Sequence, residues 1–251
     1  MLLGIAWRIT IGEDSSLSDG LTGKIQSSAD LLLAGGVKMK SIAVTDLPIK
    51  GIKVVAYERF SDKRGYFGES FRKSELFSAT GGAVGSWEIV QANESYSRAG
   101  TIRGLHFQWN PHMGKLVRTV QGHMMDLILD IRVGSPTFGF LIARDMPSAS
   151  ENNYSEWIWI PPGFAHGNLF TENTIIEYFC SGEYNGANEA GISPLAKDIN
   201  WSYCDPSLKS LFDSVAESQE LILSEKDRNG LSVEAWRCDS RSRHFIYGES
   251  T

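Results

Sequence analysis

The sequence predicts an all-β fold, a sandwich or barrel with a few short helices at its periphery. From residue 52 onward, short runs rich in β-branched and aromatic residues alternate with polar positions, which is the period-two pattern of half-buried strands. Glycine, proline, asparagine and aspartate separate these runs at short intervals, as turn residues do between consecutive strands. Few stretches show helical periodicity, and many short strands with little helix are typical of sandwiches and barrels.

The first half of this pattern contains five expected strands and one short helix. A strand at 52–60 is followed by a turn at 61–65 and a second extended run at 66–71. A helix is expected at 71–79, because a glycine-rich stretch at 81–85 then breaks the chain. Three further strands are expected at 87–93, 101–108 and 115–121.

The second half repeats the pattern with five more strands and one more helix. The strands are expected at 124–132, 139–144, 156–160, 167–170 and 175–181. The helix is expected at 207–214, because Asp205 and Pro206 are residue types favoured at a helix N-cap and at the first helical position.

Length and composition limit the class of protein. The 251 residues suffice for one domain with a substantial core plus extensions. A net charge of −6 gives no general case for nucleic-acid binding, so local arginines and lysines must meet any anionic ligand. Cys180, Cys204 and Cys238 are odd in number and far apart, which argues against a disulfide framework and fits a reducing cytoplasm. No run reaches the roughly 20 apolar residues of a membrane span.

The N-terminal residues differ in composition from the rest of the chain. A polar stretch rich in serine, glycine and aspartate covers residues 12–20, and the sequence from Met39 has the character of a protein start. We expect residues 1–38 to be a poorly ordered extension without a signal peptide. The main domain is expected to cover 39–240, and residues 241–251 a C-terminal tail.

The segment RGLHFQ at 103–108 and the strand after it carry the candidate chemistry. If the segment is a strand, alternation places Arg103 and His106 on opposite faces. Ionisable residues also lie on the neighbouring expected strands, and buried charge is costly unless it is paired or used. A cluster of such groups in a barrel mouth is therefore a candidate site, although a histidine alone on a strand is more often structural.

A second motif, IPPGFAHGN at 160–168, resembles the second conserved motif of the cupin jelly rolls and carries His166. In metal-binding cupins the first motif supplies two histidines separated by one residue, and a glutamate. The corresponding stretch here has only His106, followed two residues later by Gln108, which is a poor ligand for transition metals. We therefore expect no metal.

Seven blocks from Met39 to Trp236 resemble the dTDP-4-dehydrorhamnose 3,5-epimerase family, in that family's order. They lie at 62–71, 91–95, 103–108, 114–118, 130–139, 160–167 and 221–227. The resemblance implies a cupin-type jelly roll and an isomerase that needs no cofactor. Its substrate would be a nucleotide-linked 4-keto-6-deoxyhexose, dTDP-4-dehydro-6-deoxy-D-glucose, and its product dTDP-4-dehydro-L-rhamnose. The chain also lacks a GxGxxG dinucleotide motif after a strand.

The resemblance implies four catalytic positions. His106 matches the base that removes protons at C3 and C5, and Asp227 matches the carboxylate that orients it. Tyr178 matches the acid on the opposite face of the sugar, and alternation places it on one strand face with Ile176 and Cys180. Lys115 matches the lysine near the keto oxygen.

Further positions match residues that contact the nucleotide sugar in this family. They are Arg64, Glu69, Gln91, Asn93, Arg103, His166, Tyr184, Glu189 and Lys226. Arginine suits a diphosphate because its planar fork donates two hydrogen bonds to one phosphate, and Tyr184 matches an aromatic residue that stacks on thymine. The sequence departs from the family at Ala92, at Glu94 and in the loop 182–193. These departures leave open which nucleobase the substrate carries and how many carbons are inverted.

Three alternatives remain at this point. The chain could be a single-position epimerase of a related sugar, a sugar-nucleotide-binding module without turnover, or a metal-dependent cupin oxygenase. Retention of base, acid and orienting carboxylate together argues against a mere binder. The family resemblance also implies a homodimer in which an N-terminal strand joins the partner's sheet, and an unpaired strand at 52–60 would otherwise be exposed.

Overall fold

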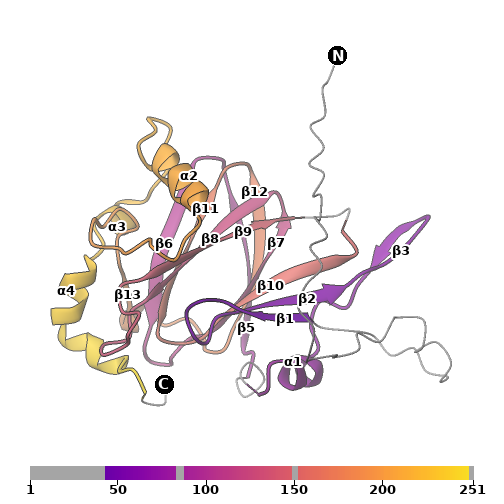
Figure 1. Ribbon diagram of the computed structural model, residues 1–251, viewed down its shortest axis with the longest axis horizontal. Helices are drawn as coiled ribbons and strands as arrows, with labels where there is room; N and C mark the ends of the chain where they lie inside the picture. Colours follow the sequence, from indigo (N-terminus) through magenta and orange to yellow (C-terminus); the bar gives the residue numbers. More distant parts are fainter. Residues whose placement is uncertain (1–42, 83–87, 149–151, 249–251) are drawn as a thin grey trace, which may run out of the picture. The chain divides into compact units, whose positions relative to one another are not determined.

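The computed structural model describes residues 43–82, 88–148 and 152–248, in which two antiparallel β-sheets pack face to face (Figure 1). The all-β prediction is therefore confirmed. The expected N-terminal extension at 1–38 lies outside the described residues. No helix in the described ranges is both long and apolar enough to cross a membrane.

The first sheet has six strands in the order β1-β2-β10-β7-β12-β5. Their bounds are Ala43–Asp46, Lys53–Glu58, Tyr154–Ile160, Lys115–Gln121, Thr174–Cys180 and Gln91–Ser97. Because β1 pairs along the free side of β2, the strand expected at 52–60 has neighbours on both sides. The expectation that it forms an unpaired edge is wrong, and β1 takes that place.

The second sheet has five strands in the order β13-β6-β11-β8-β9. Their bounds are Glu189–Gly191, Thr101–Gln108, Phe164–Phe170, His123–Asp130 and Leu141–Pro147. Both faces of β8 pack against hydrophobic clusters, since Met124 and Ile128 face one cluster while Met125, Leu127 and Leu129 face another. A strand covered on both sides is mostly hydrophobic, and β8 departs from this at the buried Asp126 and Asp130.

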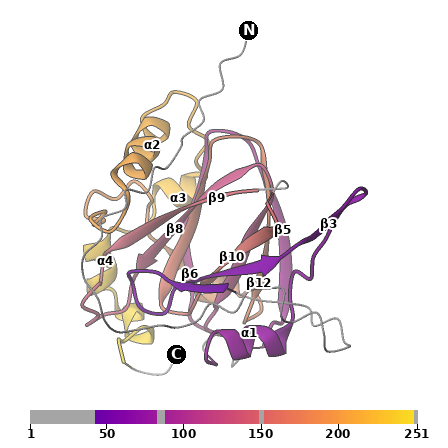
Figure 2. The ribbon, with the colours of Figure 1, turned by 45° about the vertical axis from the view of Figure 1, so that its right-hand side comes forward.

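Short elements cover the outer surfaces of the two sheets. A hairpin is formed by β3 (Phe60–Asp62) and β4 (Gly65–Phe67). Figure 2 shows α1 (Lys73–Ala79) beside the six-stranded sheet. Leu76 of α1 packs on the outer face of that sheet. On the five-stranded side lie α2 (Pro206–Ala216), α3 (Glu225–Arg228), α4 (Val233–Cys238) and two 3₁₀ turns, Gly186–Asn188 and Ser240–His244. Asp205 accepts a hydrogen bond from Ser207 N at 2.8 Å, which confirms the predicted N-cap of α2.

Three clusters of buried side chains form the core. One lies between the sheets, one lies under α1, and the largest lies between the five-stranded sheet and the C-terminal helices. The last cluster includes Trp236 and Phe245, which are 0 % and 1 % exposed. Part of the segment expected to be a tail is thus packed against the domain: Val133 N donates to Phe245 O at 2.8 Å and Tyr247 N donates back to Val133 O at 3.0 Å.

The strands at 101–108 and 115–121 begin and end where the sequence predicts. The strand expected at 87–93 lies further along, because its hydrogen-bonded pairing with β12 starts at Gln91 and continues to Ser97. The extended run expected at 66–71 ends at Phe67, and the strand expected at 167–170 begins earlier, at Phe164. These shifts follow the partner strands, which the local pattern does not contain.

Candidate functional site

Two adjoining hollows open into the space between the sheets and share four side chains, those of His106, Lys115, His166 and Tyr178. The tyrosine hollow has a volume of about 310 Å³ and is lined also by Gln91, Asn93, Gln108, Met113, Cys180, Tyr184 and Glu189. The arginine hollow has a volume of about 510 Å³ and is lined also by Ser95, Arg103, Asn168, Ile222, Lys226 and Asp227. The shared side chains are where a ligand spanning both hollows would meet ionisable groups.

A bulge in β6 brings Arg103 and His106 to the same side of their sheet. His106 pairs with His166 on β11, whereas Arg103 pairs with Asn168, so two residues of β6, Gly104 and Leu105, lie opposite the single residue Gly167 of β11. An extra residue of this kind reverses the alternation locally. The prediction that Arg103 and His106 lie on opposite faces is therefore wrong, and both line the arginine hollow.

Gly104 makes the bulge possible. Its φ of +101° lies where L side chains are strained, and a Cβ there would come within 2.6 Å of Gly167 Cα and of His166 O. Gly167 is equally confined, since its own Cβ would lie 2.4 Å from Arg103 O. Two glycines thus let β6 and β11 approach closely beside the site.

His106 is paired with Asp227, which α3 carries. His106 Nε2 and Asp227 Oδ1 lie 2.6 Å apart, and the imidazole is 28 % exposed. Ser224 caps α3 by accepting a hydrogen bond from Asp227 N at 3.1 Å, and Gly104 N donates to Asp227 Oδ2 at 3.4 Å. Burial raises the pKa of Asp227, but the hydrogen bond and the charge of His106 outweigh it and leave that pKa below its ordinary value. The carboxylate therefore stays ionised and can stabilise an imidazolium.

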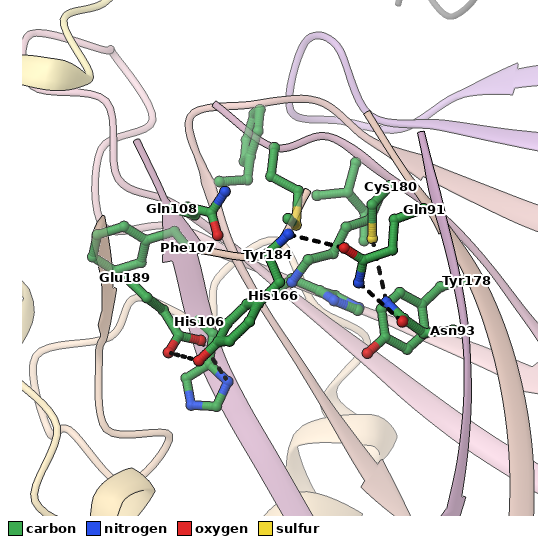
Figure 3. Close-up of a pocket in the computed structure, with 14 residues that line it drawn as sticks. Gln91, Asn93, His106, Phe107, Gln108, His166, Tyr178, Cys180, Tyr184 and Glu189 are labelled. Carbon is green, nitrogen blue, oxygen red and sulfur yellow. Dashed lines mark hydrogen bonds and ion pairs between the residues drawn. The ribbon is translucent and has the colours of Figure 1, made fainter. Parts of the chain in front are cut away.

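Tyr178 faces the same space from β12. It shares a strand face with Ile176 and Cys180, as alternation predicts, and Figure 3 shows it on the opposite side of the pocket from His106. Burial is the main reason that the pKa of Tyr178 is raised, and the neighbouring Cys180 adds to it. The phenol therefore holds its proton at neutral pH, as an acid that delivers a proton late in a reaction must.

Lys115 begins β7 directly opposite Cys180 of β12. Burial lowers the pKa of Lys115, while Cys180, Glu189 and Asp126 oppose that shift. In the part of the chain that the structure describes, its ammonium has no hydrogen-bond or ion-pair partner. It is thus free to interact with a ligand oxygen.

A polar network closes the tyrosine hollow (Figure 3). Glu189 Oε2 lies 2.5 Å from Lys226 Nζ and accepts a hydrogen bond from Tyr184 Oη at 3.2 Å. Tyr184 N donates to Gln91 Oε1 at 2.9 Å, and Gln91 Nε2 donates to Asn93 Oδ1 at 3.0 Å. Tyr184 itself is 61 % exposed, which leaves a ring face open to stacking.

Two of the predicted site residues lie away from both hollows. Arg64 is at the tip of the β3–β4 hairpin, 84 % exposed and paired with Asp62 at 2.6 Å. Glu69 accepts from Arg72 Nε at 2.9 Å. The other predicted residues line one hollow or both.

Several lining residues were not predicted to be part of the site. Gln108 holds two loops beside the tyrosine hollow, since its Nε2 donates to Pro111 O and Glu183 O at 2.9 Å. Gln108 shares a strand face with His106, so the alternation of β6 could have predicted that it lines the site. Asn168 and Cys180 also line the site, but their residue types are common in cores. No group of three or more histidine, cysteine, aspartate or glutamate side chains in the described ranges is arranged to hold a metal.

Comparison with known proteins is consistent with this site. A model of the dTDP-4-dehydrorhamnose 3,5-epimerase family matches residues 46–235. The dTDP-4-dehydrorhamnose 3,5-epimerase of Sinorhizobium fredii (strain NBRC 101917 / NGR234) is 38% identical over 172 residues, 66% of this chain and 84% of that protein. The enzyme of the same name from Methanothermobacter thermautotrophicus is 36% identical over 182 residues, 72% of this chain and 89% of that protein.

Solved structures extend the likeness to the fold. The dTDP-6-deoxy-D-glucose-3,5-epimerase of Legionella pneumophila, in complex with dTDP-4-keto-L-rhamnose, has a TM-score of 0.69 and 27% identity, covering 84% of this chain and 100% of that chain. A 3'-monoepimerase from Streptomyces bikiniensis, in complex with dTDP-quinovose, has a TM-score of 0.59 and 28% identity, covering 75% and 87%. The fold is the expected cupin-type jelly roll. The chain belongs to the dTDP-4-dehydrorhamnose 3,5-epimerase family.

Proposed function

We propose that this protein is a cofactor-independent epimerase that converts dTDP-4-dehydro-6-deoxy-D-glucose to dTDP-4-dehydro-L-rhamnose. One observation carries the proposal. His106 Nε2 is hydrogen-bonded to Asp227 Oδ1 at 2.6 Å, and Tyr178 and Lys115 border the same hollows as His106. A base, its orienting carboxylate, an acid and a cation in one pocket are what proton transfer beside a ketone requires. Relatives bearing this activity in their names support the assignment.

The ketone of the substrate makes the chemistry possible without another electron sink. A carbonyl at C4 acidifies the hydrogens on C3 and C5, so His106 removes each proton and leaves an enolate. Asp227 stabilises the imidazolium that forms, and Lys115 donates to the enolate oxygen. Tyr178 then returns a proton from the opposite face of the ring, which inverts the carbon.

We assign the nucleotide to the network around Tyr184. The exposed ring of Tyr184 would stack on thymine, and Gln91, Glu189 and Lys226 would offer acceptors and donors to the edge of the base. Arg103 lines the arginine hollow together with the shared side chains. Its Nε donates to Ser97 Oγ at 2.9 Å, which fixes the guanidinium for a diphosphate.

The family match also leads us to propose a homodimer. Arg64 and Glu69 match substrate-contacting positions of the family, yet neither lines a hollow of its own chain. The hairpin that carries Arg64 also exposes Phe60, Tyr66 and Phe67, by 41 %, 51 % and 65 %. Docking of this hairpin on a second copy would cover those rings and bring Arg64 to the partner's pocket. Sedimentation that gave a stable monomer at micromolar concentration would contradict the dimer.

A reducing compartment such as the cytoplasm is the setting we propose. Cys180, Cys204 and Cys238 are all free thiols in the structure. Fractionation of the native host would test this assignment.

Solvent exchange tests the function directly. The protein is incubated with dTDP-4-keto-6-deoxyglucose in deuterated water, and NMR follows the label at C3 and C5. Label and inversion at both carbons are expected. Label at one carbon would instead favour a single-position epimerase, as in the monoepimerase from Streptomyces bikiniensis, and no label would reject this sugar as substrate.

Substitution of the base gives the first prediction. His106→Ala should abolish exchange while leaving nucleotide binding largely intact, because the imidazole is the group that accepts the proton. His123→Ala is the matched control, since His123 is also paired with an aspartate, Asp145 at 2.5 Å, and lies outside both hollows. If His106→Ala fails to fold while the control folds, His106 is structural.

A further inference from the structure

A second histidine–aspartate pair lies beside the first. His106 and His166 are directly opposite each other on β6 and β11, and each is bonded through Nε2 to a carboxylate. His166 Nε2 lies 2.7 Å from Asp126 Oδ1. The second pair is much less accessible, because His166 is 7 % exposed and Asp126 is fully buried, whereas His106 is 28 % exposed.

Only one of the two carboxylate oxygens of the buried Asp126 accepts hydrogen bonds from described residues. Its Oδ1 accepts hydrogen bonds from His166 Nε2 and, at 2.6 Å, from Asn168 Nδ2. Its Oδ2 is buried and has no partner among the residues the structure describes. A buried carboxylate with an unused oxygen is costly, and such groups add little to stability compared with apolar replacements. Its presence beside the reaction space points to a use in the reaction.

We propose that Asp126 is a positioning residue that holds His166 as the tautomer with its proton on Nε2, so that Nδ1 accepts a hydrogen bond from a sugar hydroxyl. The inference rests on the proposed epimerase function. A carboxylate bonded to one imidazole nitrogen fixes which nitrogen carries the proton. His166 borders both hollows, so the ring presents its remaining acceptor where the hexose must lie.

Burial keeps this second imidazole uncharged. Burial is the largest of the effects that lower the pKa of His166, and the charges of Lys115 and His106 lower it too. Asp126 acts in the opposite direction and raises that pKa. An uncharged ring keeps an acceptor nitrogen, whereas an imidazolium has none. The two adjacent pairs thus take different tasks: His106 gains and loses a proton, and His166 does not.

Asp126 also acts on Lys115 through its charge. The titratable groups that line the tyrosine hollow with Lys115 are His106 on β6, His166 on β11, Tyr178 and Cys180 on β12, Tyr184 in the loop after β12, and Glu189 on β13. The charge of Asp126 on β8 acts on Lys115 as well. Burial lowers the pKa of Lys115, and Asp126 is one of three groups that raise it. Removing that negative charge lowers the pKa further, so the ammonium that stabilises the enolate is lost at a lower pH.

The test compares two buried aspartates on one strand. Asp126→Asn should move the alkaline limb of the kcat–pH profile to lower pH by roughly one unit, the size of shift expected when a neighbouring opposite charge is removed. Asp130→Asn is the control, because Asp130 is also fully buried on β8 but is bonded to Arg132, Ser135 and Thr137. It should lower stability without moving the limb. An unmoved limb in Asp126→Asn, or an equal shift in both variants, would contradict the action of Asp126 on Lys115, whereas the tautomer of His166 decides the positioning role.

A spectroscopic measurement on the unmodified protein tests the tautomer of His166 without Asp126→Asn and without turnover. Imidazole ¹⁵N shifts distinguish the two neutral tautomers, and the His166 signals are identified by their loss in His166→Gln. A neutral ring with its proton on Nε2 at pH 7.5 is expected. A proton on Nδ1, or a charged ring, would overturn the positioning role even if epimerisation is confirmed. The expected tautomer with no exchange of substrate hydrogens would instead reject the proposed function alone.

Discussion

Tyr178 shows how one side chain can separate two halves of a reaction. It borders the hollows that His106 borders but reaches them from the other sheet, and its raised pKa, caused mainly by burial, keeps the phenol protonated. In the proposed mechanism, removal of a substrate proton needs only His106, whereas inversion needs a donor on the opposite face. Exchange and inversion can therefore be separated experimentally.

Tyr178→Phe should uncouple exchange from inversion. His106 can still remove a proton and return one to the same face, so deuterium should enter the substrate with retained configuration. Formation of the inverted product should fall by about 100-fold or more, the usual contribution of a positioned general acid. NMR in deuterated water measures both quantities in one sample. Product formation at the original rate would show that another group donates the proton.

Sequence motifs predicted the residues that lie in contiguous blocks, but not those that depend on strand pairing. His106 and Asp227 each lie in one of the matching blocks, and Tyr178 was predicted from the family position that it matches. Asp126 lies outside the matching blocks, and its link to His166 exists only after β8 and β11 pair and place it opposite Asn168. Arg64 and Glu69 lie in a matching block, yet their own chain does not carry them to the pocket.

At the level of elements, the strands with clear alternation were predicted and the irregular pieces were not. The strand β13 has three residues and α3 has four, so neither contains enough positions to display a period. Pairing with β6 defines β13, and the Ser224 cap defines α3. The bulge in β6 was missed for a related reason, since period-two alternation cannot register an inserted residue.

Gly104→Ala tests the bulge. The new Cβ would clash with Gly167 Cα and His166 O at 2.6 Å, and the φ of +101° is itself strained for alanine. We expect a loss of unfolding free energy of roughly 2 kcal/mol or more and reduced activity, because Arg103 and His106 depend on this geometry. Gly134→Ala, at a φ of +86° with no atom within 4 Å of the new Cβ, should cost less. Equal losses in urea unfolding would mean that close strand approach is not the constraint.

At the scale of the whole molecule, the core extends beyond the segment that the family model matches. That match ends at residue 235, whereas Trp236 and Phe245 are buried. Their rings lie 4.6 and 5.7 Å from the ring of Phe107, which adjoins His106 and lines the tyrosine hollow. His112 Nε2 lies 2.9 Å from His244 O, so the loop after β6 is held as well. Phe245 and His244 thus support the strand that carries His106, the proposed base.

Phe245→Ala should therefore act on both stability and function. Removing a fully buried phenylalanine from a packed cluster costs about 3 to 5 kcal/mol, and the cavity lies directly behind Phe107. We expect a lower melting temperature and, below it, a higher KM, because the wall of the tyrosine hollow loses its support. Phe77→Ala is the matched control, since Phe77 is 49 % exposed on α1. Equal losses of stability in the two variants would show that packing of the C-terminal segment does not stabilise the domain. An unchanged KM in Phe245→Ala would mean that Phe245 contributes to stability but not to substrate binding.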